Sequence, residues 1–104
     1  MEKLEAIATK EIRPGFFGKM VHGENGTLAF WEIKKDSVLE EHSHFHEQIT
    51  YISEGELEMT IGGIEYLLTP GMVHVIPPNV KHSAKAKTDC RVIDSFAPAR
   101  TDYQ

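Results

Sequence analysis

The chain has 104 residues, enough for one domain with a single core and too few for two. Hydrophobic residues make up 40% and charged residues 26%, as in an ordinary soluble globular protein and unlike a disordered or fibrous one. The formal charge is -5 and the basic residues are scattered, which excludes the clustered basic face that a nucleic-acid partner needs. The acidic N-terminus lacks a secretory signal and no apolar run is long enough to cross a membrane, so we expect a cytoplasmic protein with no membrane partner.

Short runs of alternating apolar residues, punctuated by turn residues, predict an all-β fold. Residues 1–10 have weak helical or extended character, and their structure is left open. Residues 27–34 form the first predicted strand, and both of its faces are apolar, which favours burial on both sides. We expect a single domain over residues 1–104, with its barrel core at about residues 27–96.

Residues 42–48 contain histidine or glutamine at every second position, and a continuous strand would present these side chains on one face. The residues are His42, His44, His46 and Gln48. A neutral imidazole is the commonest side-chain ligand for a transition metal, so the segment predicts a metal site. The alternative is a solvated, histidine-rich strand. His22 and His74 lie outside this pattern, and we expect them to be structural or surface residues.

The second half of the chain predicts a hairpin and two further strands. Residues 56–61 and 64–68 flank Gly62-Gly63, a pair that accepts the positive φ angles of a tight primed turn. Residues 72–76 form the next predicted strand, which Pro77-Pro78-Asn79 ends, and a last strand runs from about Cys90 to Phe96. Cys90 is the only cysteine, and we expect it to pack as a small hydrophobe. Because so small an all-β domain must bury its sheets against each other, the expected architecture is a compact double-stranded barrel.

The spacing of these residues resembles the two-motif signature of the cupin superfamily over residues 36–86. The first motif is matched by His42, His44, Gln48 and Gly55, and the second by Gly71, Pro77 and His82. Asp36 and Asn79 stand where glycines are expected, Gln48 replaces the usual glutamate, and Ala86 replaces an asparagine. The resemblance implies a jelly-roll barrel, or double-stranded β-helix, with a metal in its mouth held by His42, His44, Gln48 and His82. It also leads us to expect a homodimer, since small cupins commonly associate in pairs.

Three neutral imidazoles and a neutral amide leave the charge of a bound metal uncompensated. Such a centre attracts an anionic substrate and acts mainly as a Lewis acid. The sequence leaves the ion open among Zn, Ni, Fe, Mn and Cu, because imidazole-rich ligation suits several of them. His46 is either a fifth inward-facing group or a support for the site, and Tyr51 either lines the pocket or belongs to the core.

A second group of chemically active residues lies near the C-terminus. Asp94 and Phe96 would share one face of the last strand, and Pro98 stops that strand before Arg100. A purely structural alternative is an ion pair between Asp94 and Arg100 beside a core phenylalanine.

Together with the metal ligands, Asp94, Phe96 and Arg100 resemble the active site of the KdgF family of cupins. This resemblance implies metal-dependent conversion of 4,5-unsaturated uronic acid monosaccharides, the products of pectin and alginate breakdown, to linear keto forms. It assigns the catalytic roles to Asp94, Phe96 and Arg100, and a small anionic sugar acid as the substrate. Two other functions stay open: a non-catalytic cupin that binds sugar acids, and a small-molecule cupin dioxygenase.

Overall fold

The computed structural model describes residues 1–103, which form two antiparallel β-sheets and two short 3-10 turns. The strands are β1 (Lys10–Arg13), β2 (Phe16–His22), β3 (Thr27–Ile33), β4 (Val38–His42), β5 (Glu47–Glu54), β6 (Leu57–Ile61), β7 (Ile64–Leu68), β8 (Val73–Ile76), β9 (His82–Ala86) and β10 (Cys90–Ala97). The turns are η1 (Leu4–Ala6) and η2 (Thr101–Tyr103). The all-β prediction is confirmed.

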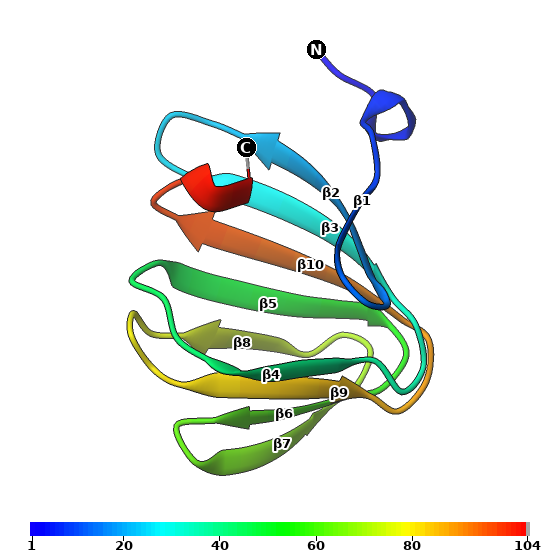
Figure 1. Ribbon diagram of the computed structural model, residues 1–104, viewed down its shortest axis with the longest axis vertical. Coiled ribbons are helices and arrows are strands. Elements are labelled where there is room, and N and C mark those ends of the chain that lie inside the picture. Colours follow the sequence, from blue (N-terminus) through cyan, green and yellow to red (C-terminus); the bar gives the residue numbers. More distant parts are fainter. Residues whose placement is uncertain (104) are drawn as a thin grey trace.

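The chain passes back and forth between the two sheets, as a jelly-roll topology requires. One sheet has the strand order β1-β2-β3-β10-β5-β8, and the other has the order β4-β9-β6-β7. The sheets curve around a shared interior (Figure 1). That interior is filled by aliphatic and aromatic side chains from both sheets, including the fully buried Ile52 and Ile76. Burial of this shared apolar surface holds the two sheets together.

The two ends of the chain occupy different positions. The segment with η1 projects from the body, whereas η2 lies over the barrel beside β10 (Figure 1). Between η1 and residue 27 the chain forms β1 and β2, two strands that the sequence patterns did not predict. None of the helical turns within residues 1–103 has the length and apolar character needed to span a bilayer.

The hairpin between β6 and β7 forms as predicted, with Gly62 and Gly63 at φ angles of 57° and 81°. Positive φ also occurs at two non-glycine positions of the cupin motifs, Asp36 at 69° and Asn79 at 65°. At Gly55, φ is 86° and a Cβ would overlap the carbonyl oxygen of Asp89, so the residue must remain glycine. The motif glycines therefore mark sharp turns, and Asp and Asn adopt the same backbone conformation where they replace glycine.

Two sequence predictions were wrong in detail. Residues 42–48 are not one strand, because β4 ends at His42 and β5 begins at Glu47, and the residues between them carry the chain from one sheet to the other. β3 is not buried on both faces, since its outer residue Leu28 is 39% exposed while the inner face is buried. Both errors arise because a local apolar pattern does not reveal which sheet a strand joins or what covers its outer face.

Candidate metal centre

Three histidines from separate parts of the fold converge at one end of the interior. His42 at the end of β4 pairs directly with His82 at the start of β9, and their ring centroids are 4.2 Å apart. His44 reaches the same place from the connection between β4 and β5. One ring nitrogen from each of the three lies within 4.8 Å of the other two. This clustering is close enough for the three imidazoles to bind a single ion.

Each of the three rings is held by a hydrogen bond from Nδ1 to a backbone carbonyl. The distances are 2.9 Å for His42 to Glu40, 3.0 Å for His44 to His46 and 2.9 Å for His82 to Val80. A carbonyl oxygen can only accept, so Nδ1 carries the proton of the neutral imidazole and Nε2 carries the lone pair. The backbone therefore fixes the tautomer that a metal ligand needs.

The rings are also kept neutral by their surroundings. Burial lowers the pKa of His42 and of His44, and it lowers the pKa of His82 to about 4. The positive charges of neighbouring groups act in the same direction, because a charged imidazole would be repelled. At neutral pH the three Nε2 lone pairs are consequently available for a cation.

Gln48, on β5, is oriented toward the three histidines by a chain of hydrogen bonds. Its Nε2 donates to the hydroxyl of Thr50 at 2.9 Å, and that hydroxyl donates to Oδ1 of Asp94 at 2.7 Å. An ionised Asp94 can only accept, which fixes the direction of the chain and turns Oε1 of Gln48 toward His44. Oε1 and the His44 Nε2 are then 3.1 Å apart, two electron-pair donors facing each other.

A bound cation would stabilise that arrangement, since both atoms could donate electron pairs to it instead of repelling each other. The donor set of three imidazole nitrogens and one amide oxygen fits a divalent transition metal such as Zn, Ni, Fe, Mn or Cu. His42, His44, Gln48 and His82 would hold it, as the sequence resemblance implied.

Asp94 and Phe96 point into the interior from β10, next to this group. They pair across the sheet with Thr50 and Gln48 respectively, so the predicted shared face of Asp94 and Phe96 is confirmed. Burial raises the pKa of Asp94 to about 6 despite the hydrogen bond from Thr50. The Phe96 ring lies edge-on to His44, with centroids 5.8 Å apart. A carboxyl group able to exchange a proton near neutrality is thus linked through the Thr50 hydroxyl to the ligand candidate Gln48.

Arg100 lies buried at the mouth of the interior, but its partner is not Asp94. Its Nε and Nη2 donate to the two carboxylate oxygens of Asp102 at 3.0 and 2.7 Å. The guanidinium also lies over two aromatic rings, with its central carbon 4.6 Å from the Phe96 centroid and 4.0 Å from that of Tyr103. The alternative ion pair between Asp94 and Arg100 is absent from the ion pairs of residues 1–103, because Asp102 takes that position.

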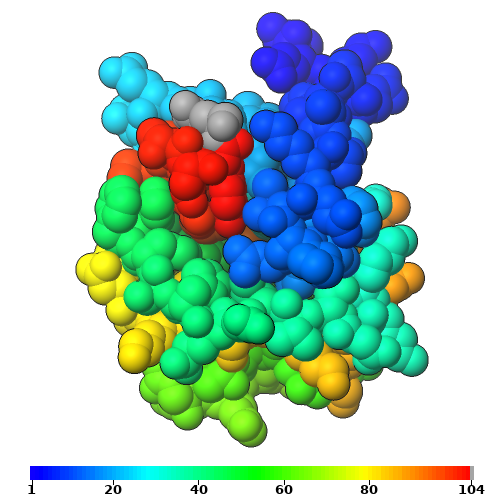
Figure 2. Space-filling view, in the orientation of Figure 1, coloured from blue at the N-terminus to red at the C-terminus, as the bar shows by residue number. Residues whose placement is uncertain are grey.

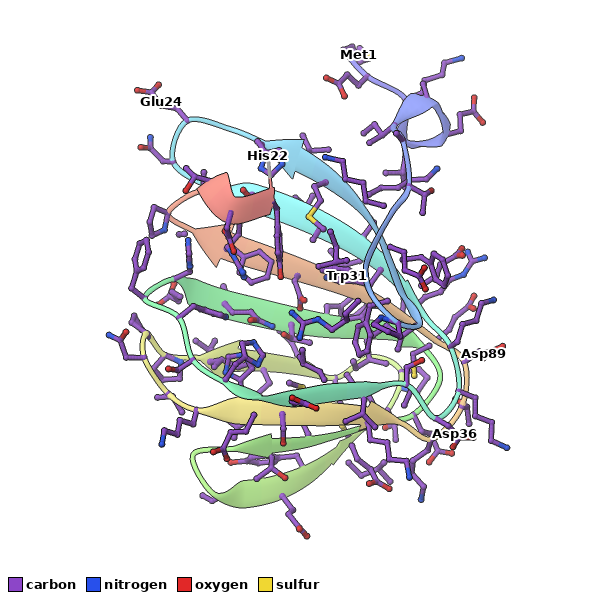
Figure 3. All side chains as sticks on the ribbon, in the orientation of Figure 1. Met1, His22, Glu24, Trp31, Asp36 and Asp89 are labelled. Carbon is purple, nitrogen blue, oxygen red and sulfur yellow. The ribbon has the colours of Figure 1, made fainter. Side chains whose placement is uncertain are left out.

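A small cavity of about 50 Å³ connects these groups. It is lined by His42, Gln48, His82, Asp94, Phe96 and Arg100, and also by Arg13, Trp31, Thr50 and Tyr103. Trp31 lies on the inner side of β3, behind the β1 segment (Figure 3). Thr50 could have been found from sequence, since it follows Gln48 at the next inward position of a strand. The sequence did not point to Arg13, because it lies at the end of a short strand that no alternating pattern predicted.

The remaining candidate residues lie outside the ligand group. His46 is 4% exposed behind His44, its ring stacks on Phe45 at 4.1 Å, and neither ring nitrogen has a hydrogen-bond partner within residues 1–103. Tyr51 is 38% exposed on the outer face, so it belongs neither to the pocket nor to the core.

The other two histidines and the cysteine behave as predicted. His22 bonds to the Thr27 hydroxyl, and His74 lies beside Tyr66. Cys90 is buried, and burial raises the pKa of its thiol.

Curated relatives with this kind of sequence have several activities. The chain is similar to the H2HPP isomerase of Bacillus subtilis, with 30% identity over 72% of this chain and 37% of the relative. It is also similar to the pectin degradation protein KdgF of Dickeya dadantii, with 33% identity over 60% of this chain and 58% of the relative. The chain therefore spans only about a third to three-fifths of the length of these two relatives.

Solved structures match along more of their length. An RmlC-like cupin from Shewanella frigidimarina superimposes with a TM-score of 0.94 and 28% identity, covering 100% of this chain and 95% of that one. KdgF from Halomonas sp. superimposes with a TM-score of 0.87 and 30% identity, covering 93% and 91% respectively. The family model described as "Cupin domain" matches residues 29–96, which contain all four metal-ligand candidates. Because that match spans more than half of the sequence, the chain belongs to the cupin domain family.

Proposed function

We propose that this cupin converts 4,5-unsaturated uronic acid monosaccharides to their linear keto forms. The observation that carries the proposal is that one cavity is lined by ligand candidates for a metal together with Asp94, Phe96 and Arg100. The similarity to two proteins named KdgF, one of them a pectin degradation protein, supports the same chemistry. The fold alone would not, since cupin relatives of this chain carry out different reactions.

Ring opening of such a substrate requires a proton at C4 and net addition of water at C5. The resulting hemiketal opens to the linear ketone. Asp94 is the group proposed to hold and move the proton, because a pKa of about 6 allows both protonation states near neutrality. Thr50 donates to Oδ1 of Asp94, and the second carboxyl oxygen is the one proposed to act on the substrate, directly or through one water.

The other residues position the ring and its charge. His42, His44, Gln48 and His82 would hold a divalent metal, which would supply Lewis-acid chemistry toward an oxygen of the substrate. Phe96 provides an apolar surface against the sugar ring and excludes water from the carboxyl of Asp94. Arg100 offers the substrate those N–H groups that Asp102 leaves free, and its guanidinium is fixed between two aromatic rings.

Substrate entry requires the mouth of the barrel to open. A cavity of about 50 Å³ holds a few water molecules and is smaller than a sugar ring. Residues from both ends of the chain line it, Arg13 from β1 and Tyr103 from η2. We expect these two segments to move apart when a sugar acid binds.

A turnover assay tests the proposal directly. The metal-loaded protein should remove the C4=C5 absorbance of unsaturated galacturonate, or of the products derived from mannuronate and guluronate, faster than buffer does. Asp94→Asn should abolish turnover and keep the metal, whereas Glu65→Gln, at an exposed position on β7, should keep both turnover and metal.

The same assay separates the other two functions. Binding of the acid without turnover by the wild-type protein would indicate a sugar-acid-binding cupin. Oxygen consumption by an iron-loaded protein would indicate a dioxygenase.

A further inference from the structure

We propose that Arg13, at the end of β1, is the residue that binds the carboxylate of the incoming ligand. The inference rests on the proposed function only for the identity of the acid as a uronate. The feature behind it is a contrast between the two guanidinium groups that line the cavity, Arg13 and Arg100.

Arg13 is held at the cavity mouth by the fold of its own strand. The pairing of β1 with β2 shifts register between Glu11 and Arg13, and the chain then turns through Gly15, where φ is 83°. The Gly15 amide donates to the Glu11 carboxylate at 3.1 Å, so the acid nearest in sequence binds the turn. Arg13 is half-buried and lines the same cavity as His42 and Asp94.

The charge of Arg13 is not neutralised by the protein. No carboxylate within residues 1–103 forms an ion pair with it at 4.0 Å or less, although Asp36 and Glu40 line the outer cleft that it also borders. Arg100, in contrast, donates to both oxygens of Asp102 and is enclosed by two aromatic rings. Arg13 therefore has no N–H donor engaged by a carboxylate within residues 1–103, whereas Arg100 keeps for a ligand only the N–H groups that Asp102 leaves free.

The chemistry of the cavity favours an anion in contact with that group. His42, His82 and Gln48 line the cavity beside Arg13, and Asp94 supplies the only carboxyl group among the described lining residues. Arg13 and His42 line the same cavity, so a ligand that reaches the histidine cluster also comes within reach of the guanidinium. A ligand carboxylate placed beside Arg13 gains a planar, bidentate partner where water is partly excluded. The β1 segment and the C-terminal turn, the two segments expected to move apart on binding, lie next to each other on the viewed face (Figure 2).

Calorimetry with a non-reacting acid tests the inference. D-galacturonate has the carboxylate but no C4=C5 double bond, and its methyl ester has the same ring without the charge. With zinc-loaded protein we expect the acid to bind more tightly than the ester. Arg13→Gln should lower the affinity for the acid about 10- to 100-fold and leave the affinity for the ester unchanged. Lys10→Gln removes the same charge from an exposed position on β1 and should change neither affinity.

Three results would overturn the inference. They are equal affinity of the wild-type protein for acid and ester, an equal effect of Arg13→Gln on both, and loss of the acid preference only in Arg100→Gln. Metal content and thermal unfolding report whether Arg13→Gln is folded. If it is not folded, Arg13→Lys serves as the test, because lysine keeps the charge but lacks the planar fork of the guanidinium. This variant should lower the affinity for the acid by a smaller factor. Unchanged affinity for the acid would contradict the proposal.

The test is independent of turnover. If unsaturated uronates are not converted but the acid preference depends on Arg13, the proposed reaction fails and the carboxylate site stands. If turnover occurs and Arg13→Gln leaves KM unchanged, the reaction stands and the carboxylate site fails.

Discussion

The two ends of the barrel interior are built by the same strands and differ in polarity. The buried polar side chains gather at the end with the histidine cluster, where the apolar Ile76 and Ile61 pair with Gln48 and His82. The inward side chains toward the other end, where Asp36 and Asp89 lie (Figure 3), are apolar. β5 runs inward from Gln48 and Thr50 to Ile52, β9 from His82 to Ala84 and Ala86, and β10 from Asp94 back to Val92 and Cys90. A single strand therefore contributes to the core and to the candidate site at successive inward positions.

This difference separates stability from chemistry along the length of each strand. The apolar end buries hydrocarbon surface between the sheets, which favours folding. The polar end buries imidazoles, an amide and a carboxyl, which costs free energy unless hydrogen bonds and a cation compensate. Changes at the two ends should consequently affect different measurements.

The largest effect is expected from His82→Ala, at the polar end. Loss of one of four ligands should weaken metal binding by more than about 100-fold, since losing even an outer support of a ligand costs about 10- to 100-fold. Metal content after dialysis, followed by the turnover assay, measures this, and both should fall. His74→Ala, on β8 and outside the ligand group, is the control. Full metal content in His82→Ala would contradict the ligand assignment.

Ile52→Ala tests the apolar end of the same interior. Ile52 is fully buried, and its truncation should lower the free energy of unfolding by about 2–5 kcal/mol through lost burial and a cavity. Urea unfolding measures the loss. Ile64→Ala, where the side chain is 59% exposed, should change stability by less than about 0.5 kcal/mol. If the Ile52→Ala protein binds metal as weakly as His82→Ala while still folded, the two ends are not independent.

The smallest effect concerns the free energy of unfolding that the metal-free protein loses when the buried carboxyl of Asp94 ionises. Its pKa is about 6 when folded and 3.8 when free, so the folded state holds this proton more tightly than the unfolded state. The stability contributed by that proton is full below pH 3.8 and is lost as pH rises through about 6.

Asp94→Asn, which stays neutral and can still accept from Thr50, should therefore gain about 2–3 kcal/mol over the wild-type protein above pH 6 and little below pH 4. Unfolding of both metal-free proteins at several pH values measures the gap. A gap that does not change between pH 4 and pH 7 would mean that burial does not control the charge of Asp94.

Much of the fold was accessible from sequence where local rules apply. The Gly62-Gly63 hairpin, the strand that ends at Pro77 and the inward pair Asp94 and Phe96 depend on turn preferences and on the two-residue period of a strand. The predicted continuous strand at residues 42–48 failed because the alternating pattern coincides with a crossing between sheets. His42 and His44 converge there through the path of a loop and not through the pleat of one strand.

By itself the sequence determined the ligand candidates, the sharp turns that space them and the alternation that makes the chain all-β. The tertiary structure alone decided which ring nitrogen each histidine presents, that Asp102 and not Asp94 binds Arg100, and that Arg13 reaches the same cavity. The physical reason is the range of the interactions. Turns and strand periods depend on neighbouring residues, whereas these contacts depend on register between strands and on how the two ends of the chain close over the barrel.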